Sequence, residues 1–355
     1  MGIVTRVRKA AYLYVIVFFV FLFLYPLLAF SQTGNITPVN TGLMQPGANT
    51  ANLLNPEKPV VKTENTKRDL FDVTLELLTS AHGQQTFDVI DENENLISRL
   101  KFPHRGQAMI LKGELYMLPR LSLGGRWCST SFLQLSNANS TDTDWKEATG
   151  DLVWQESNDS TKTEVSFSDI NLYARVLKLE KGVGKNSRLS LDLFGGYQYQ
   201  KSCYNMQDMT TTVSNYVPVS SKEEGHDSFY KIIYRGPRLG TRGEYAYNRF
   251  SVRLSFAYAW LKTNATALWN LRNYPFFQHG DGFDGYGVDL NAELIYQITK
   301  NISGGFGYNY MTRRQHKMRE SGTDNTGNGP YSESDIIRNA NSTLYGPSVF
   351  VRVNW

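Results

Sequence analysis

The chain has 355 residues, of which 41% are hydrophobic and 13% aromatic, and its formal net charge is +4. Three cations, Arg6, Arg8 and Lys9, lie in the N-terminal segment treated next, and taking them from +4 leaves +1, too little for a general attraction to nucleic acid. Two cysteines make no disulfide scaffold, and no phosphate-binding loop, dinucleotide fingerprint or cysteine–histidine metal spacing appears, so we expect neither a metal nor a cofactor.

Residues 1–31 have the pattern of a secretory signal peptide. The three cations are followed by an uncharged stretch over 10–28 and then by Ala29, Phe30 and Ser31, a small-x-small cleavage pattern before Gln32. We expect removal after Ser31. The apolar stretch is also long enough to stay as a membrane anchor, and the sequence leaves that alternative open.

Residues 32–68 are rich in Asn, Thr, Pro, Gly and Lys and show no apolar period. This composition predicts a disordered leader on the periplasmic side.

Segments of alternating polarity recur from residue 69 to residue 355. The sequence therefore predicts an all-β domain, a ten-stranded antiparallel transmembrane β-barrel. The expected strands lie near 69–80, 98–117, 120–135, 164–178, 187–204, 228–247, 249–262, 285–298, 302–313 and 341–355.

The connections alternate in length. Short turns are expected at Leu118 and Pro119, over 180–186, at Asn248 and over 299–301, and long polar loops over 81–97, 136–163, 205–226, 263–284 and 314–340. Bacterial outer-membrane barrels keep short turns in the periplasm and long loops outside. We therefore expect a multi-pass outer-membrane protein with five extracellular loops.

The last eight residues give the clearest strand pattern. Val349, Val351, Val353 and Trp355 share one face, and the intervening positions are mostly polar. Alternation that ends on a terminal aromatic is typical of the last strand of an outer-membrane barrel.

A soluble β-sandwich is the alternative fold, because it also alternates apolar and polar positions. The aromatic residues argue against it, since they share the apolar phase and lie towards strand ends, as membrane-interface girdles require. These residues are Tyr197, Tyr199, Tyr258, Trp260, Tyr296, Phe306, Tyr308 and Tyr310.

Charged residues occupy the opposite phase, eight of them acidic and seven basic. At membrane depth they must face an enclosed lumen and pair with one another. Ten strands enclose a narrow lumen, so free conduction is not the default expectation. The set is Asp72, Glu76, Lys112, Glu114, Arg126, Asp169, Arg175, Asp192, Arg238, Arg242, Glu244, Arg253, Asp289, Glu293 and Arg352.

The two cysteines fall in opposite phases of their strands. Cys128 shares the polar phase and Cys203 the apolar phase. Residues on opposite faces of a sheet do not form a disulfide without a bulge, so both are expected to be free.

Four segments resemble the omptins, ten-stranded outer-membrane barrels of Gram-negative bacteria, many of them surface proteases. They are 108–119, the cluster Asp142, Asp144 and Trp145, then 154–157 and 195–204, in matching order and spacing. The likeness covers about 69–355 and is greater still to the divergent omptin-like barrels called protochlamydial outer membrane proteins. It implies the same ten-stranded fold.

The resemblance also implies a site, of which the sequence keeps half. An omptin protease uses an Asp-x-Asp pair and an Asp-x-His pair at the extracellular mouth, and Asp142 and Asp144 match the first pair. Ala267 and Trp269 stand where the second pair should be, and Ala265 replaces a substrate-binding acid. At an exposed site the pKa of the remaining carboxylates should stay low, so we expect no proteolysis by this mechanism.

A rearranged catalytic site is one alternative to the loss of protease activity. His279 and Asp281 carry an imidazole and a carboxylate in reversed order and could rescue catalysis if their loop brought them over the lumen, although Gly280, Gly282 and Gly285 also suggest a plain turn. Asp142 and Asp144 have a simpler alternative as turn or capping residues.

Basic residues near the rim are candidates for contact with lipopolysaccharide phosphates, as in omptins: Lys201, Lys231 and Arg235, together with Arg313 and Arg314. Ordinary snorkelling at the interface would explain them equally well. Asn-x-Ser/Thr triplets are interpreted as loop composition, and no glycan is inferred from them.

The sequence thus favours a non-catalytic, omptin-like surface barrel that contacts outer-membrane lipid, lipopolysaccharide and a host-surface or matrix ligand, or that serves a structural role. A narrow porin-like channel and an endopeptidase with a rearranged site are the alternatives. No nucleic-acid partner is expected, and the pattern specifies neither the ligand nor the oligomeric state.

Overall fold

The computed structural model describes residues 70–90, 93, 95–130, 138–146, 149–180, 187–207, 209–222, 227–268, 274–323 and 329–355. The expected signal peptide and leader, the 180–186 turn apart from Glu180, and Trp269 lie outside these residues. Within them, no helix has the length and apolar character needed to cross a membrane.

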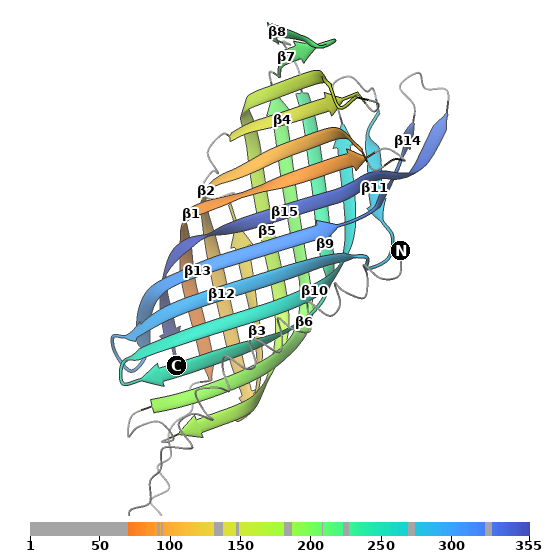
Figure 1. Ribbon diagram of the computed structural model, residues 1–355. Helices are drawn as coiled ribbons and strands as arrows, with labels where there is room; N and C mark the ends of the chain where they lie inside the picture. Colours follow the sequence, from red (N-terminus) through yellow and green to blue (C-terminus); the bar gives the residue numbers. More distant parts are fainter. Residues whose placement is uncertain are drawn as a thin grey trace, which may run out of the picture. The chain divides into compact units, whose positions relative to one another are not determined.

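Ten long antiparallel strands close into a barrel (Figure 1), which confirms the predicted fold class and excludes the sandwich. Closure is made by pairing between the first strand, β1, and the last, β15. The strands are β1 (Phe71–Ile90), β2 (Leu96–Leu118), β3 (Leu121–Ser129), β5 (Leu152–Glu180), β6 (Ser187–Gln207), β9 (Asp227–Tyr247), β10 (Phe250–Leu268), β12 (Gly285–Gln297), β13 (Ile302–Gln315) and β15 (Pro330–Asn354).

The alternation of the sequence sets the two faces of the wall. On β15 the side chain of Val351 is 53% exposed on the outer face, and that of Arg352 is 4% exposed inside. The predicted aromatics Tyr197, Trp260 and Tyr308 also stand on the outer face. Because an apolar outer face favours hydrocarbon and a charged inner face requires partners, the wall has the polarity of a membrane barrel.

The prediction of five long loops was wrong. The strands continue beyond the barrel wall at one end, where β4 (Ala138–Trp145) pairs with β2 and β5, and β7 (Thr210–Ser214) pairs with β5 and β8 (Val217–Lys222). Farther round the ring, β11 (Phe276–Gly280) pairs with β10 and β14 (Met318–Thr323), and β14 pairs with β15. These segments are short, and most of them are polar on both faces, so they lack the apolar period by which strands are recognised.

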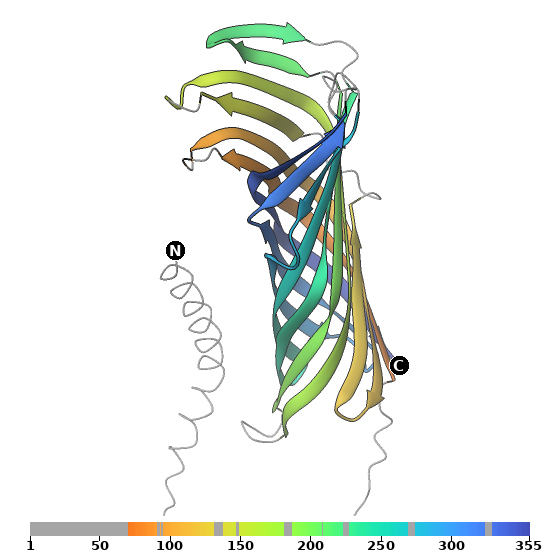
Figure 2. The same cartoon turned by 90° about the vertical axis from the view of Figure 1, so that its right-hand side faces the viewer.

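We call this end the tall end, and Figure 2 shows its hairpins projecting past the barrel. The opposite end, the short-turn end, has tight connections at Pro119 and Arg120, at Asn248, and between β12 and β13, as predicted. Asn248 has φ 54, the left-handed conformation that favours Asn or Gly in a two-residue turn.

Both cysteines are free, as predicted. Cys128 is buried inside the barrel, and Cys203 lies on the outer face opposite Lys231.

Candidate functional site

All fifteen predicted lumen charges form ion pairs, which confirms their pairing. Near the short-turn end Arg242 Nη1 lies 2.6 Å from Glu114 Oε2, and Arg175 Nε lies 2.8 Å from Asp192 Oδ1. Lys112 Nζ bridges Glu76 Oε2 at 2.5 Å and Glu293 Oε1 at 2.7 Å. Charges in a low-dielectric interior are tolerated only with such partners.

Five residues form the centre of this network, which we call the Asp169–Asp289 cluster. Asp289 accepts hydrogen bonds from Arg126 Nη2 and, at 2.5 Å, from Arg313 Nη1, and Arg238 Nη2 lies 3.1 Å from its carboxylate. Asp169 accepts from Arg126 and Arg238. The guanidinium of Arg126 also lies 4.4 Å from the ring centre of Phe167. Each carboxylate therefore holds at least two cations.

Arg313 corrects one prediction. It was expected at the outer rim, whereas it is 1% exposed and points into the lumen, where it pairs with Asp289. Gly287 makes room for it, because a Cβ at that position would lie 2.9 Å from Arg313 Cδ.

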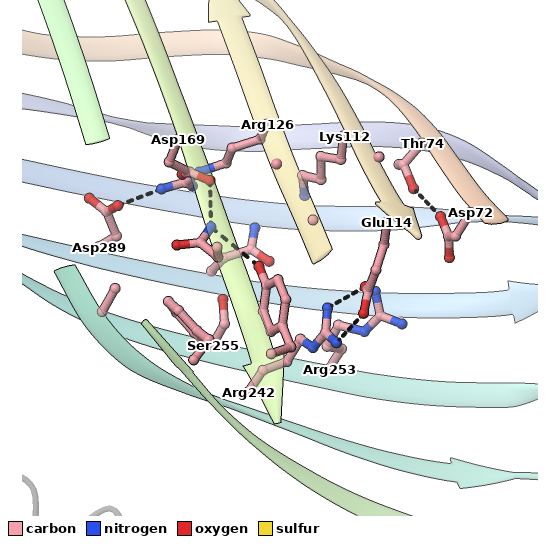
Figure 3. A pocket seen from close by; sticks show the side chains of 18 of the residues that line it. Asp72, Thr74, Lys112, Glu114, Arg126, Asp169, Arg242, Arg253, Ser255 and Asp289 are labelled. Carbon is pink, nitrogen blue, oxygen red and sulfur yellow. Dashed lines mark hydrogen bonds and ion pairs between the residues drawn. The ribbon is translucent and has the colours of Figure 1, made fainter. Parts of the chain in front are cut away.

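The charged layer encloses a cavity of about 90 Å³, lined among others by Arg126, Asp169, Arg242 and Asp289 (Figure 3). This volume is enough for a few water molecules and too small for a typical ligand.

Towards the tall end the lumen is filled by aromatic side chains, a layer absent from the predictions. The ring centres of Phe87 and Tyr230 are 4.3 Å apart, as are those of Phe102 and Tyr204. All four side chains are at most 1% exposed. For Phe102, Tyr204 and Tyr230 the strand phase, shared with inward residues such as Arg238, was the sequence signal that pointed inside. Phe87 is out of phase with Asp72 and Glu76, because a β-bulge after Leu78 changes the face to which later residues of β1 point.

Both layers join strands on opposite sides of the barrel. Phe87 on β1 and Tyr230 on β9 are separated by β2, β3, β5 and β6 in one direction and by β15, β13, β12 and β10 in the other. Arg126 on β3 and Asp289 on β12 are opposed in the same way. Side chains therefore cross the lumen at two levels.

The predicted acidic pair lies at the tall end, beyond the membrane-facing part of the wall. Asp142 stands opposite Leu100 on β2 and Glu156 on β5, and Asp144 is two positions along the same face. Burial, with Asp144 and Glu156 nearby, raises the pKa of Asp142 to about 8. Burial also raises the pKa of Asp144.

The prediction that these carboxylates keep low pKa values was therefore wrong. The loop expected at 136–163 is a strand pair that partly buries Asp142, and a neighbouring carboxylate favours its neutral form. The pKa of the Asp142 carboxyl group is therefore no argument against proton transfer by this residue.

The facing wall is apolar at the two positions where acidic residues were sought, although the neighbouring β11 and β14 carry the buried Gln278 and Glu320, with Gln278 Nε2 2.8 Å from Glu320 Oε2. Ala265 and Ala267, where the resemblance called for acidic residues, are 3% and 1% exposed and pack in the aromatic layer with Phe276. No imidazole faces Asp142 from the described part of this wall.

His279 and Asp281 are not brought to Asp142. The strand of His279, β11, is separated from β4 by β5, β6, β9 and β10 in one direction and by β2, β1, β15 and β14 in the other. Gln278 is buried inside, whereas His279 is exposed, with Nδ1 3.2 Å from Asn264 Oδ1. The two halves of the supposed site lie across the mouth with the imidazole turned away.

Comparison with solved structures shows which known proteins have a similar fold. The outer membrane protease OmpT from Escherichia coli is similar with a TM-score of 0.70 and 15% identity, over 81% of this chain and 97% of that chain. The chain has the fold of an outer-membrane barrel. Neisserial surface protein A (TM-score 0.27, 9% identity, 80% of this chain and 97% of that one) and the translocator domain of the autotransporter NalP from Neisseria meningitidis (0.34, 10%, 82% and 90%) agree far less. No family model and no curated protein matches the chain.

Three of the predicted basic residues, Lys201, Lys231 and Arg235, lie on the outer face of the barrel. Arg235 on β9 stands opposite Tyr199 on β6 and Lys262 on β10, and Lys231 stands opposite Cys203. Lys201 is on the same face, two positions before Cys203. The cations lie beyond the outward Tyr197 and Trp260, towards the tall end, so they are placed just above the aromatic girdle.

Proposed function

We propose that this chain is an omptin-like outer-membrane barrel that acts through its protruding hairpins, with the tall end outside the cell, and not through its lumen. The OmpT-like fold and the resemblance of four segments support the family placement. The tall end offers exposed groups such as Tyr216 and Val217 at the tip of the β7–β8 hairpin, which suit contact with a host-surface or matrix ligand.

The observation that carries this proposal is the filled lumen. Contacts between opposed strands, Arg126 with Asp289 and Phe87 with Tyr230, place side chains across the lumen at two levels. A porin needs an open lumen lined by mobile water. The narrow-channel alternative is correspondingly disfavoured.

Planar-bilayer recording of the refolded protein tests the proposal. We expect no stable conductance steps, because the Asp169–Asp289 cluster and the aromatic side chains around Phe87 and Tyr230 both cross the lumen. A general porin recorded in the same bilayers is the positive control. Reproducible steps of one size from the wild-type protein would overturn the proposal in favour of a channel.

The facing wall also supports the absence of protease activity. A water-activating site of the omptin kind needs a base opposite Asp142 and Asp144, and Ala265 and Ala267 provide none. The pKa of Asp142 is raised, but within the described parts of β10 and β11 no imidazole points towards it from across the mouth.

A fluorogenic dibasic peptide assay in lipopolysaccharide-containing micelles checks this point. We expect cleavage by the wild type to equal that of Asp142→Ala and of His279→Ala. Cleavage that both substitutions abolish would restore the rearranged-protease hypothesis, whereas cleavage that survives both would indicate a contaminating enzyme.

Lipopolysaccharide is the proposed lipid partner of Lys201, Lys231 and Arg235, because clustered cations above an aromatic girdle suit phosphate groups. We expect lipopolysaccharide to raise the unfolding temperature of the wild type by several degrees and to raise that of the triple Gln variant by less than half as much. Lys300→Gln, at the short-turn end, is the matched control. An equal gain in the triple variant would exclude the site.

A further inference from the structure

A serine and a histidine meet on the outer face of β1. Ser80 Oγ lies 2.8 Å from His82 Nε2, within hydrogen-bond distance. Leu78 and Ala81 are fully buried inside the barrel, whereas His82 is exposed. The pair is therefore separate from the lumen and from the acidic residues of the tall end.

A β-bulge shapes the strand at this pair. Leu78 pairs with Ala108 on β2 and the next pairing is Ala81 with Gly106, so two residues of β1 oppose one of β2. The register with β15 also shifts between Leu78 and His82. Bulges commonly re-aim side chains beside active sites.

Gly346 on β15 allows the bulge to approach. A Cβ at that position would lie 2.0 Å from the carbonyl oxygen of Ser80, so any other residue would push the strands apart. The position of Ser80 is thus held by backbone packing on the β15 side.

The pair lies where the outer face changes from apolar to polar. On β1 and β15 the outward positions towards the short-turn end are Leu75 and Val349, both exposed and apolar. Beside His82 are Tyr345 on β15, with ring centres 6.1 Å apart, and Arg105 on β2, directly opposite. In a bilayer this boundary is the depth of the ester groups, which join acyl chains to headgroups.

We propose that Ser80 and His82 form a catalytic pair that hydrolyses ester-linked acyl chains of membrane lipids. A nucleophilic hydroxyl in hydrogen-bond contact with an imidazole is the minimal arrangement for acyl transfer. The acyl chain would lie along the Leu75 side, and Arg105 would hold the phosphate of the headgroup as a positioning residue.

The reaction balances with water as the only co-reactant. Ser80 Oγ forms a bond to the ester carbonyl carbon while its proton passes to His82 Nε2, and the C–O bond to the lipid alcohol breaks as that alcohol takes the proton. Water then attacks the acyl-serine and gives a proton to His82. Cleavage of the acyl–Ser80 bond releases a fatty acid, and His82 returns the proton to Ser80.

Turnover is expected to be slow. Among the described residues no carboxylate hydrogen-bonds to the second ring nitrogen of His82, and loss of that orienting group costs about 10⁴-fold in serine hydrolases. Formation of the acyl-serine bond is therefore a sharper measure than steady-state turnover.

The test uses the full-length protein refolded in phospholipid-containing micelles and treated with a fluorophosphonate probe. Mass spectrometry should locate the adduct on Ser80, with the labelling rate lowered at least tenfold in His82→Gln. Fatty-acid release from a radiolabelled phospholipid should fall to background in Ser80→Ala, and Arg105→Gln should raise KM more than it lowers kcat. Thr79→Val, which alters the adjacent hydroxyl, should retain labelling.

Two outcomes would overturn the proposal. One is a wild type that neither labels nor releases fatty acid above Ser80→Ala, provided that both migrate as folded barrels on unheated gels. The other is an adduct on a residue other than Ser80.

Discussion

Replacing Asp289 by alanine should destabilise the barrel by about 3–5 kcal/mol, because one carboxylate that compensates three arginines inside the lumen disappears. Arg126 and Arg238 would then keep only Asp169, and Arg313 would lose the carboxylate with which it pairs in the Asp169–Asp289 cluster. Arg238 and Arg313 are 5% and 1% exposed, so water reaches them poorly. Chemical denaturation in detergent micelles, followed by intrinsic fluorescence, measures the change.

A second substitution separates lost charge balance from lost packing. Asp289→Ala combined with Arg313→Met removes one surplus cation while keeping side-chain volume, and should recover part of the stability lost in Asp289→Ala. Asp281→Ala, at an exposed position, serves as the control. A midpoint for Asp289→Ala within error of the wild type would show that water screens the cluster and that the lumen is not closed at this level.

Raising the pH from 5 to 9 should loosen the β4–β5 hairpin. The folded-state pKa of Asp142 is raised to about 8, from an ordinary value of 3.8. Between these values the folded state binds a proton that the unfolded state lacks, so stability falls as pH rises and is lowest above pH 8. Asp142 and Glu156 face each other, and ionising Asp142 adds repulsion within that pair.

Hydrogen–deuterium exchange of the 138–145 segment, corrected for intrinsic rates, measures this loosening. We expect a loss of protection of at least tenfold between pH 5 and pH 9, well under the unscreened value because Asp142 keeps some contact with water. Asp142→Asn should remove most of this pH dependence, with the raised pKa of Asp144 accounting for the remainder, and Asp151→Asn, at the exposed hairpin tip, should leave the profile unchanged. The idea fails if wild-type protection is the same at both pH values.

The alternation of residues along each strand predicted which face of the barrel wall most side chains occupy. It assigned Arg352 and Val351 to opposite faces and placed Cys128 inside, because a strand of fixed period leaves only two choices for each side chain. It failed where polar residues occupy both faces: Ser140, Asp142 and Asp144 alternate with Thr141 and Thr143, and no apolar period separates this strand from a loop.

The contacts of the candidate site were less predictable, because they join strands far apart in the chain. Lumen charges were expected to pair, but Lys112 meets Glu293 from a strand 181 residues away only because the barrel closes at its particular size. Arg313 was misplaced for a related reason, since a residue near a strand end was taken for a rim residue before the strand's full length was known. The raised pKa of Asp142 likewise depends on β5.

The seam between β1 and β15 governs how the molecule is assembled. Trp355 O accepts hydrogen bonds from Leu70 N at 2.8 Å and Phe71 N at 3.1 Å, and the rings of Phe71 and Trp355 lie 5.5 Å apart. The sheet therefore has open edges until its final strand docks, and during that interval its unpaired backbone groups can pair with other chains. Truncations that remove β15 should consequently accumulate as aggregates and not as smaller barrels.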